Sequence, residues 1–326
     1  MATTEQIKAL IRSHVDHDDE RFLALALQVA AHSARQGHGR ISEEIKRLVD
    51  EGRRKGPPRR GAGPVAVITP RGELAGLLAA SAPRTHVSDM VLDASIRAKL
   101  ERVLREQRAA DKLLSHGLEP ARKLLLVGPP GSGKTMSAAA LAGELGLPLY
   151  VIVFHSLITR FMGETAAKLR LVFDALAETR GVYLFDEFDA IGAERAAGND
   201  VGEIRRVLNS FLQFLEQDDS RSLVVAATNH PQSLDAALFR RFDTVIEFDW
   251  PTPALAEEAV RNRLAAFDSG GLDWDAVRRA LGGLSYAEVA AACDAAAKDA
   301  VLADTTLITT ERLVAALGER RRGRQG

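Results

Sequence analysis

The sequence predicts an α/β fold, with a parallel sheet that is covered by helices on both faces. Between residues 87 and 250, short apolar runs such as Leu124–Val127 alternate with stretches of helical spacing. Continuous apolar runs of this length are typical of strands that are buried on both faces. After Pro251-Thr252-Pro253 the sequence becomes rich in Ala and Leu up to residue 318. This change of pattern predicts a second, all-helical subdomain.

The first 52 residues predict a small helical domain that precedes the sheet. Three short segments place apolar residues at helical spacing, for example Ile41, Ile45, Leu48 and Val49, with Ser42 as the cap of that helix. Such helices can bury one another's apolar stripes as a bundle. Residues 53–84 are a linker and connecting segment that starts with a basic run rich in Pro and Gly. This run would fit a solvated hinge or a contact with nucleic acid, and its shortness favours the hinge.

The elements of the large α/β subdomain, residues 85–250, follow from the same periodicities. A helix is expected at 95–115, where Ile96, Leu100 and Val103 share one face. Strands are expected at 123–127, 148–154, 181–185, 222–227 and 244–248. Helices are expected at 134–145, 165–178 and 203–216. Residues 251–318 are expected to form the small helical subdomain, and residues 319–326 a flexible basic tail.

The composition excludes several classes of protein. The 326 residues carry a formal net charge of −1, which provides no global field for nucleic acid or acidic membranes. The single cysteine, Cys293, excludes an intrachain disulfide framework and is expected to be a packed helical thiol. The N-terminus shows no secretory pattern, and its longest apolar stretch, residues 23–31, is too short to span a bilayer. We therefore expect a cytoplasmic protein without a membrane partner, and the charge does not favour nucleic acid as a partner.

A glycine-rich loop, residues 128–135, follows the apolar run 124–127 and precedes an expected helix. It has the sequence Gly-Pro-Pro-Gly-Ser-Gly-Lys-Thr. In this setting the N–H groups of the loop and of the helix N-terminus bind phosphate oxygens. Lys134 can reach the β- and γ-phosphates, and the Thr135 hydroxyl can bind Mg²⁺. A plain glycine-rich turn is the alternative, and the Lys-Thr pair favours a nucleotide site. Its expected contacts are Gly128, Pro129, Pro130, Gly131, Ser132, Gly133, Lys134, Thr135 and Met136.

Polar side chains follow two further strands of the expected sheet. Asp186 and Glu187 come directly after the apolar run 182–185, and Asn229 follows the run 223–228. Open α/β sheets bind ligands at the carboxyl ends of their strands. Asp186 can hold Mg²⁺ there, and Glu187 can orient and deprotonate an attacking water. Asn229 can position that water, although solvated acids and turn chemistry are the alternatives for these three residues.

Two adjacent arginines, Arg240 and Arg241, precede the last expected strand. Guanidinium groups supplied by a neighbouring subunit stabilise charge on a phosphoryl group during its transfer. The alternative is a pair of surface arginines, which sequence spacing alone does not exclude.

These motifs together resemble the AAA+ ATPases, specifically the AAA clade of single-ring, bacterial-type protein-remodelling enzymes. The resemblance covers residues 85–318. GPPGSGKT resembles the Walker A motif, VYLFDEFDAIG at 182–192 the Walker B motif, and AATNHPQSLDAALFRRFD at 226–243 the second region of homology. The segment 283–301 resembles the lid helix, with Tyr286 where the family pattern has Gly.

The resemblance implies a P-loop NTPase-type sheet followed by a helical lid, with ATP and Mg²⁺ bound between the subunits of a homo-oligomer, expected to be a hexamer. It implies that Asn229 is the sensor 1 residue and that Arg240 and Arg241 are arginine fingers acting in trans. The stretch Phe161-Met162-Gly163 resembles pore loop 1, which grips a peptide in the channel of the ring. The alternative is that Phe161 and Met162 belong to the core of the next helix. A second pore loop is expected at 195–200.

The function expected from this resemblance is ATP-driven remodelling, unfolding or disassembly of a protein client. The chain has no His-Glu-x-x-His motif, so a fused zinc protease is excluded. The helical domain at 1–52 resembles recruitment domains of single-ring relatives. Two alternatives remain: an ATP-gated regulatory partner of another protein, such as a peptidase, and a DNA-acting helicase loader.

Overall fold

The computed structural model divides into two compact units, Gly63–Trp250 and a second one that contains Pro251–Gly326. The structure describes residues 72–152, 162–188, 201–234 and 236–322, with the single positions or short stretches 25–27, 29–30, 43, 47, 70 and 157. The expected N-terminal bundle and its linker therefore lie almost entirely outside the described residues. Within the described part, no helix is long and apolar enough to cross a bilayer.

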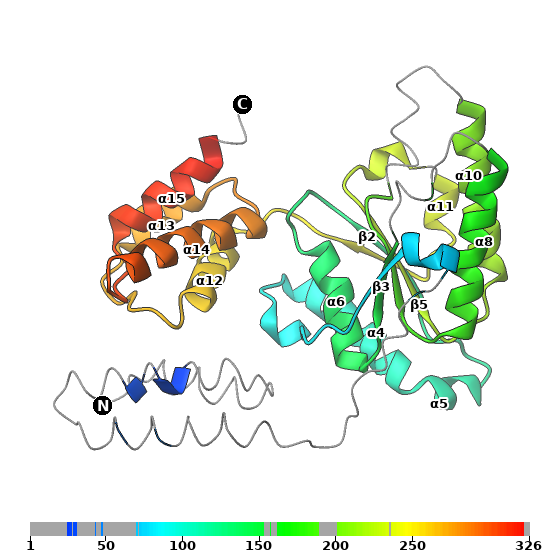
Figure 1. Cartoon of the computed structure of the whole chain (residues 1–326), viewed down its shortest axis with the longest axis horizontal. Helices are drawn as coiled ribbons and strands as arrows, with labels where there is room; N and C mark the ends of the chain where they lie inside the picture. The colour runs from blue at the N-terminus through cyan, green and yellow to red at the C-terminus, as the bar shows by residue number, and fades with distance from the viewer. Residues whose placement is uncertain are drawn as a thin grey trace. The chain divides into compact units, whose positions relative to one another are not determined.

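A six-stranded sheet is the centre of the first unit (Figure 1). Its order is β1 (Leu78–Ser81), β3 (Leu149–Ile152), β4 (Val182–Phe185), β5 (Leu223–Thr228), β2 (Lys123–Val127) and β6 (Thr244–Glu247). Five strands are parallel, as the sequence predicts, and β1 pairs with β3 in the antiparallel direction. The parallel strands all end at one edge, which we call the carboxyl edge, and begin at the other, the amino edge.

Helices cover both faces of this sheet, as expected for strands that are apolar throughout (Figure 1). Leu124 and Leu126 of β2 pack with α4 (Ala94–Arg108) and α6 (Lys134–Leu145). Leu125 and Val127 point to the opposite face, because side chains alternate along a strand, and belong to the core under α8 (Met162–Glu178) and α10 (Val201–Gln217). The remaining short elements are η1 (Gly72–Gly76), η2 (Val87–Asp89), α5 (Ala110–Leu114), η4 (Pro231–Ser233) and α11 (Ala236–Phe239).

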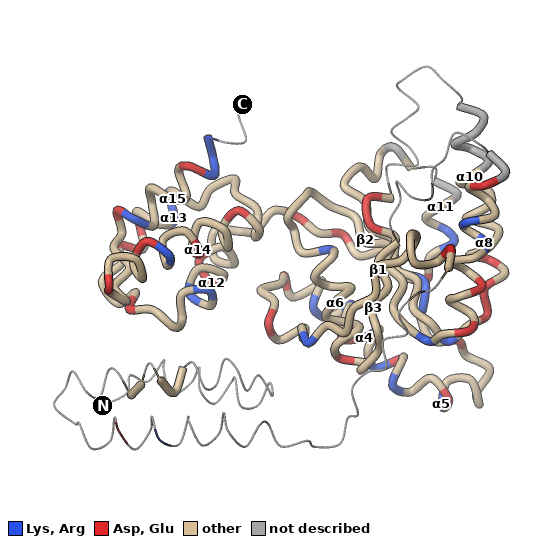
Figure 2. Tube along the Cα trace, in the orientation of Figure 1, with Lys and Arg blue, Asp and Glu red and all other residues tan. Residues whose placement is uncertain are grey.

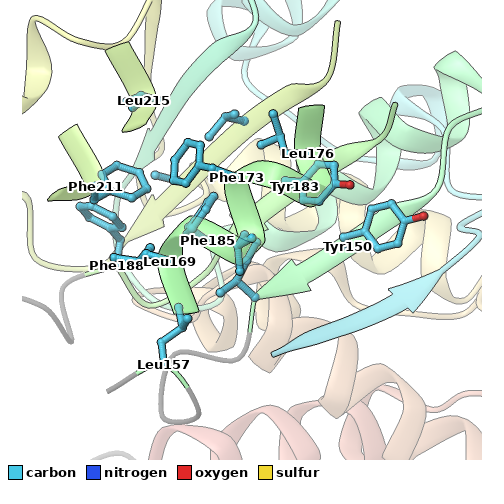
Figure 3. Packing of buried hydrophobic residues seen from close by; sticks show 14 of the residues in the cluster. Tyr150, Leu157, Leu169, Phe173, Leu176, Tyr183, Phe185, Phe188, Phe211 and Leu215 are labelled. Atoms are coloured by element: carbon cyan, nitrogen blue, oxygen red, sulfur yellow. The ribbon is translucent and has the colours of Figure 1, made fainter. Parts of the chain in front are cut away.

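An aromatic cluster fills the core on the α8 and α10 side (Figure 3). Phe185, the last residue of β4, packs edge-on against Phe211 of α10, with ring centroids 5.0 Å apart. Phe188 also packs on Phe211, at 4.8 Å, and is completely buried. Since Phe185 and Phe188 flank Asp186 and Glu187, the cluster anchors the acidic pair from both sides.

Three of the expected helices have other boundaries in the structure. The helix expected at 203–216 is slightly longer, Val201–Gln217. The single helix expected at 95–115 is divided at Ala109, whose φ of −102° and ψ of 17° end α4 before α5 begins. Its N–H is shared between the carbonyls of Arg105 and Glu106, which closes the helix at that point. Helix α8 begins at Met162 rather than at residue 165.

Between residues 251 and 322, the second unit is built from helices, as expected: α12 (Pro253–Arg263), α13 (Trp274–Leu281), α14 (Tyr286–Leu302) and α15 (Thr310–Arg322). Its core contains Val260, Val289 and the buried Cys293, so this cysteine is a packed helical thiol. Burial raises the pKa of Cys293 to about 12. Acidic and basic residues are interspersed along these helices (Figure 2).

The last helix corrects the expectation of a flexible tail from residue 319. Helix α15 continues to Arg322. Arg321 donates to the carbonyl oxygens of Ala280 at 2.9 Å and Gly282 at 2.7 Å. These carbonyls lie at the end of α13, where helices leave acceptors unsatisfied. A basic side chain thus caps one helix from the last turn of another.

Candidate functional site

The glycine-rich loop connects β2 to α6 at the carboxyl edge, as the sequence predicts. Gly128, Gly131 and Gly133 have φ angles of 147°, 72° and 105°, which side chains rarely tolerate. A Cβ on Gly128 would lie 2.4 Å from the carbonyl oxygen of Phe248, so only glycine fits at this position. Gly133 is the N-cap of α6, which leaves the first N–H groups of the helix directed at the loop.

Lys134 links this loop to the neighbouring strand. Its side chain is 6% exposed, and Nζ donates to the carbonyl oxygens of Gly128 and Pro129, both at 2.8 Å. It also donates to Oδ1 of Asn229 at 2.7 Å. Asn229 follows β5, which pairs with β2, so the sheet order brings these two predicted site residues together. An ammonium held in this way can exchange backbone acceptors for phosphate oxygens.

Thr135 and Asp186 form the second contact between predicted site residues. The Thr135 hydroxyl donates to Oδ2 of Asp186 at 2.7 Å. The other carboxylate oxygen, Oδ1, accepts the N–H of Glu187 at 2.9 Å. Glu187 has a φ of 52°, an uncommon conformation for a residue with a side chain. It is exposed, whereas Phe188 after it is buried and donates its N–H to Ala227 at 2.8 Å.

One polar group in the loop lacks a hydrogen bond. The Ser132 hydroxyl is buried, the residue is 2% exposed, and the hydroxyl has no hydrogen-bond partner within the described part of the chain. A buried hydroxyl without a partner is energetically unfavourable, typically by about 1–3 kcal/mol. Together with the N–H groups of the α6 N-terminus, this group fits a loop that an anionic ligand completes.

A segment that the sequence analysis did not single out also lines the loop. Met90, which follows η2, is 5% exposed, and its methyl carbon lies 3.5 Å from the position that a Cβ on Gly133 would take. Arg97 of α4 fixes this segment by donating to the carbonyl oxygen of Met90 at 2.8 Å. No motif marks Met90, so the contact emerges only from the fold.

The two predicted arginines are not brought to the same place. Arg240 and Arg241 precede β6, whose partner β2 precedes the glycine-rich loop, and the two strands are parallel. The arginines therefore lie at the amino edge, on the order of 15 Å along the strands from the loop of the same chain. Both are exposed, and Arg241 forms an ion pair with Glu216 of α10.

The structure describes only some of the expected pore-loop residues. Phe161 lies outside the described residues, as does the second expected loop at 195–200. Met162 and Gly163 form the start of α8, and their side chains are not described. In the second unit, Ser285 caps α14 through a reciprocal pair of hydrogen bonds with Glu288, and Tyr286 is the first helical residue.

Comparison with known proteins identifies the relatives of this arrangement. The model of the ATPase family associated with various cellular activities (AAA) matches residues 124–250. An uncharacterized AAA family ATPase, y4kL, of Sinorhizobium fredii is 33% identical over 331 residues, which cover 100% of this chain and 98% of that protein. The ATP-dependent zinc metalloprotease FtsH of Acidothermus cellulolyticus is 34% identical over 268 residues, which cover 78% of this chain but 40% of that protein.

A solved structure supports the fold. The crystal structure of the FIGL-1 AAA domain superimposes with a TM-score of 0.61 and covers 79% of this chain and 91% of its own. The identity between the two is 22%, so this likeness concerns the architecture alone. The sheet order, the glycine-rich loop and the relative that matches over nearly its whole length all indicate the same family. The chain therefore belongs to the AAA family of ATPases, which bind and hydrolyse ATP.

Proposed function

We propose that this ATPase assembles into a ring, expected to be a hexamer, whose active sites lie between subunits and whose ATP hydrolysis remodels a protein client. The observation that carries the proposal is the separation of the catalytic groups. Lys134, Thr135 and Asp186 meet at the carboxyl edge. Arg240 and Arg241 lie at the opposite edge of the same sheet. A complete site therefore requires arginines from a second copy.

The residues at the carboxyl edge divide the work of hydrolysis. The backbone N–H groups of the loop and Lys134 would bind the phosphates of ATP. Thr135 and Asp186 supply the hard oxygen ligands that Mg²⁺ prefers, and this ion would neutralise charge on the phosphate oxygens. Glu187, exposed beside Asp186, would orient the attacking water and accept its proton. Asn229, already bonded to Lys134, would position that water.

A mixing experiment tests the assembly of the site. Lys134→Ala subunits cannot use ATP but supply arginines, whereas Arg240→Ala/Arg241→Ala subunits bind ATP but supply none. Each is expected to be inactive alone, and a mixture should recover activity at interfaces where both halves are intact. Mixed rings are verified by pull-down of a tagged subunit. Mixed rings that remain inactive at every ratio would contradict sites completed in trans.

A second experiment tests whether ATP hydrolysis drives the translocation of a protein client. A translocating ring grips its client with an aromatic residue, for which Phe161 is the candidate. An unfolded, labelled casein should raise the ATPase rate of the wild type and of Phe161→Tyr, but not of Phe161→Ala. Basal hydrolysis should be equal in all three proteins. If Phe161→Ala responds like the wild type, the ATPase acts as a regulatory partner, for example of a peptidase, and not as a translocating motor.

A further inference from the structure

A buried ion pair lies at the amino edge of the sheet, away from the glycine-rich loop. Arg122, the residue before β2, donates through its guanidinium to the carboxylate and to the carbonyl oxygen of Asp218, the residue after α10. The two side chains are 12% and 4% exposed. The second carboxylate oxygen of Asp218 accepts the N–H of Ser220 at 3.1 Å. Both charges are thus largely removed from water, and both carboxylate oxygens are used.

Stability alone does not explain such a pair. Removing two charges from water costs several kcal/mol, so apolar residues of similar volume often give an equal or higher free energy of unfolding. A buried pair instead favours one geometry, because other arrangements leave a charge without its partner. The neighbouring contacts of Arg122 show which segment this geometry fixes.

That segment carries the arginine pair. Asp243, two residues after Arg241, accepts the backbone N–H groups of Arg122 at 2.8 Å and Lys123 at 2.9 Å with a single oxygen, Oδ2. Its own N–H donates to the carbonyl oxygen of Lys123 at 2.8 Å. Only two residues after Arg241, the chain is therefore hydrogen-bonded through Asp243 to Arg122, the residue that pairs with Asp218.

Helix α10 holds the same segment from the other side. Glu216, two residues before Asp218, pairs with Arg241, and the two side chains are 43% and 48% exposed. An exposed pair of this kind contributes little to stability, because water already solvates both charges. It can bias the orientation of Arg241, but it cannot hold the segment in place. The fixed points are the largely buried ion pair of Arg122 with Asp218 and the three backbone hydrogen bonds by which Asp243 is joined to Arg122 and Lys123.

We propose that Arg122, Asp218 and Asp243 form a positioning cluster that aims Arg240 and Arg241 at the nucleotide of the neighbouring subunit. The cluster touches no reacting atom, and its effect is the placement of the two guanidinium groups. This inference rests on the proposed intersubunit site. It adds that α10 and the start of β2 determine how accurately one subunit places its arginines at the nucleotide of the next subunit.

The mixing experiment separates positioning from folding. Asp218→Asn is introduced either into the Lys134→Ala subunits, which only donate arginines, or into the Arg240→Ala/Arg241→Ala subunits, which only receive them. In the donor, the recovered ATPase rate should fall roughly tenfold or more, since small misplacements of a catalytic group are costly. In the receiver, the rate should stay within about twofold. A purely structural role would lower the rate equally in both arrangements, which would overturn the proposal.

Matched variants keep the result interpretable. Asp219→Asn makes the same change one residue along, at an exposed side chain, and should have no effect in either arrangement. Asp218→Glu restores the charge and should recover part of the donor activity. If Asp218→Asn does not fold, the double substitution Arg122→Met/Asp218→Leu removes both charges and should give the same loss of ATPase rate in the donor. Full donor activity in the folded variant overturns the proposal. An inactive mixture of unmodified donor and receiver contradicts the intersubunit site itself.

Discussion

The carboxyl and amino edges of one sheet carry polar groups of different kinds. At the carboxyl edge, Ser132 has a buried hydroxyl without a hydrogen-bond partner in the described chain, and Glu187 is exposed in an uncommon backbone conformation. At the amino edge, both carboxylate oxygens of Asp218 and Oδ2 of Asp243 accept hydrogen bonds from groups of the chain itself. The first edge is arranged so that a ligand completes it. At the second edge, the hydrogen bonds are made within the chain, and their role is to fix the local conformation.

The largest expected effect concerns the carboxyl edge. Glu187→Gln removes the proposed general base while keeping the size of the side chain. We expect the ATPase kcat to fall by about 10²–10⁴-fold, with ATP still bound, because the proposed phosphate contacts do not involve this carboxylate. Hydrolysis is measured by phosphate release and binding by a fluorescent ATP analogue. Glu119→Gln, an exposed carboxylate before β2, is the control and should leave both unchanged.

The amino edge should show the opposite pattern, a loss of stability. Arg122→Ala leaves the carboxylate of Asp218 buried without its partner, so we expect the free energy of unfolding to fall by about 3–5 kcal/mol. Urea denaturation followed by circular dichroism measures this. Arg221→Ala removes a nearby but exposed ion pair with Asp111 and should change stability by less than about 1 kcal/mol.

A double substitution at the amino edge sharpens the comparison. Arg122→Met/Asp218→Leu should recover most of the stability that Arg122→Ala loses, since a matched apolar pair avoids the desolvation of two charges. If the double variant is as unstable as Arg122→Ala, the ion pair is the source of stability, and the contrast between the two edges is wrong.

A smaller effect is expected from backbone geometry in the glycine-rich loop. Gly128→Ala would place a Cβ 2.4 Å from the carbonyl oxygen of Phe248, at a φ of 147°. We expect a loss of about 1–3 kcal/mol, because β2 or the chain after β6 must shift. ATP binding should weaken as well, since the loop moves with it. Gly76→Ala, where a Cβ meets nothing within 4 Å, should lie within about 0.5 kcal/mol of the wild type.

The two edges also differ in how well the sequence predicts them. At the carboxyl edge, Asp186 and Asn229 directly follow a strand, and Lys134 ends the glycine-rich loop that follows another. Parallel strands place such residues at one edge. Short motifs therefore reveal this part of the site. At the amino edge, Arg122 and Asp218 are 96 residues apart, and nothing in their surroundings marks them as partners. Met90 was missed for the same reason. Contacts of this kind depend on the three-dimensional packing of segments that have no common motif.

The smallest effect comes from an ion pair of the same residue types in the lid. Arg263 donates to both carboxylate oxygens of Asp294, at 2.7 and 2.6 Å, but the side chains are 53% and 41% exposed. Water already solvates both charges, so Asp294→Asn should cost no more than about 1 kcal/mol at pH 7. The hydrogen bond from Arg263 holds the pKa of Asp294 below its ordinary value of 3.8.

This pair therefore stabilises the fold fully above pH 3.8, and its contribution disappears as the pH falls through the lowered pKa, where the carboxylate becomes protonated. The difference between wild type and Asp294→Asn in urea denaturation should accordingly shrink as the pH falls below 3.8. If Asp294→Asn lowered the free energy of unfolding at pH 7 as much as Arg122→Ala does, burial would not be what distinguishes the two pairs. Suppose that Asp294→Asn lowers the free energy of unfolding only slightly and in a pH-dependent way, whereas Arg122→Ala lowers it strongly. Burial then determines how much the loss of one partner of an arginine–aspartate pair destabilises this chain.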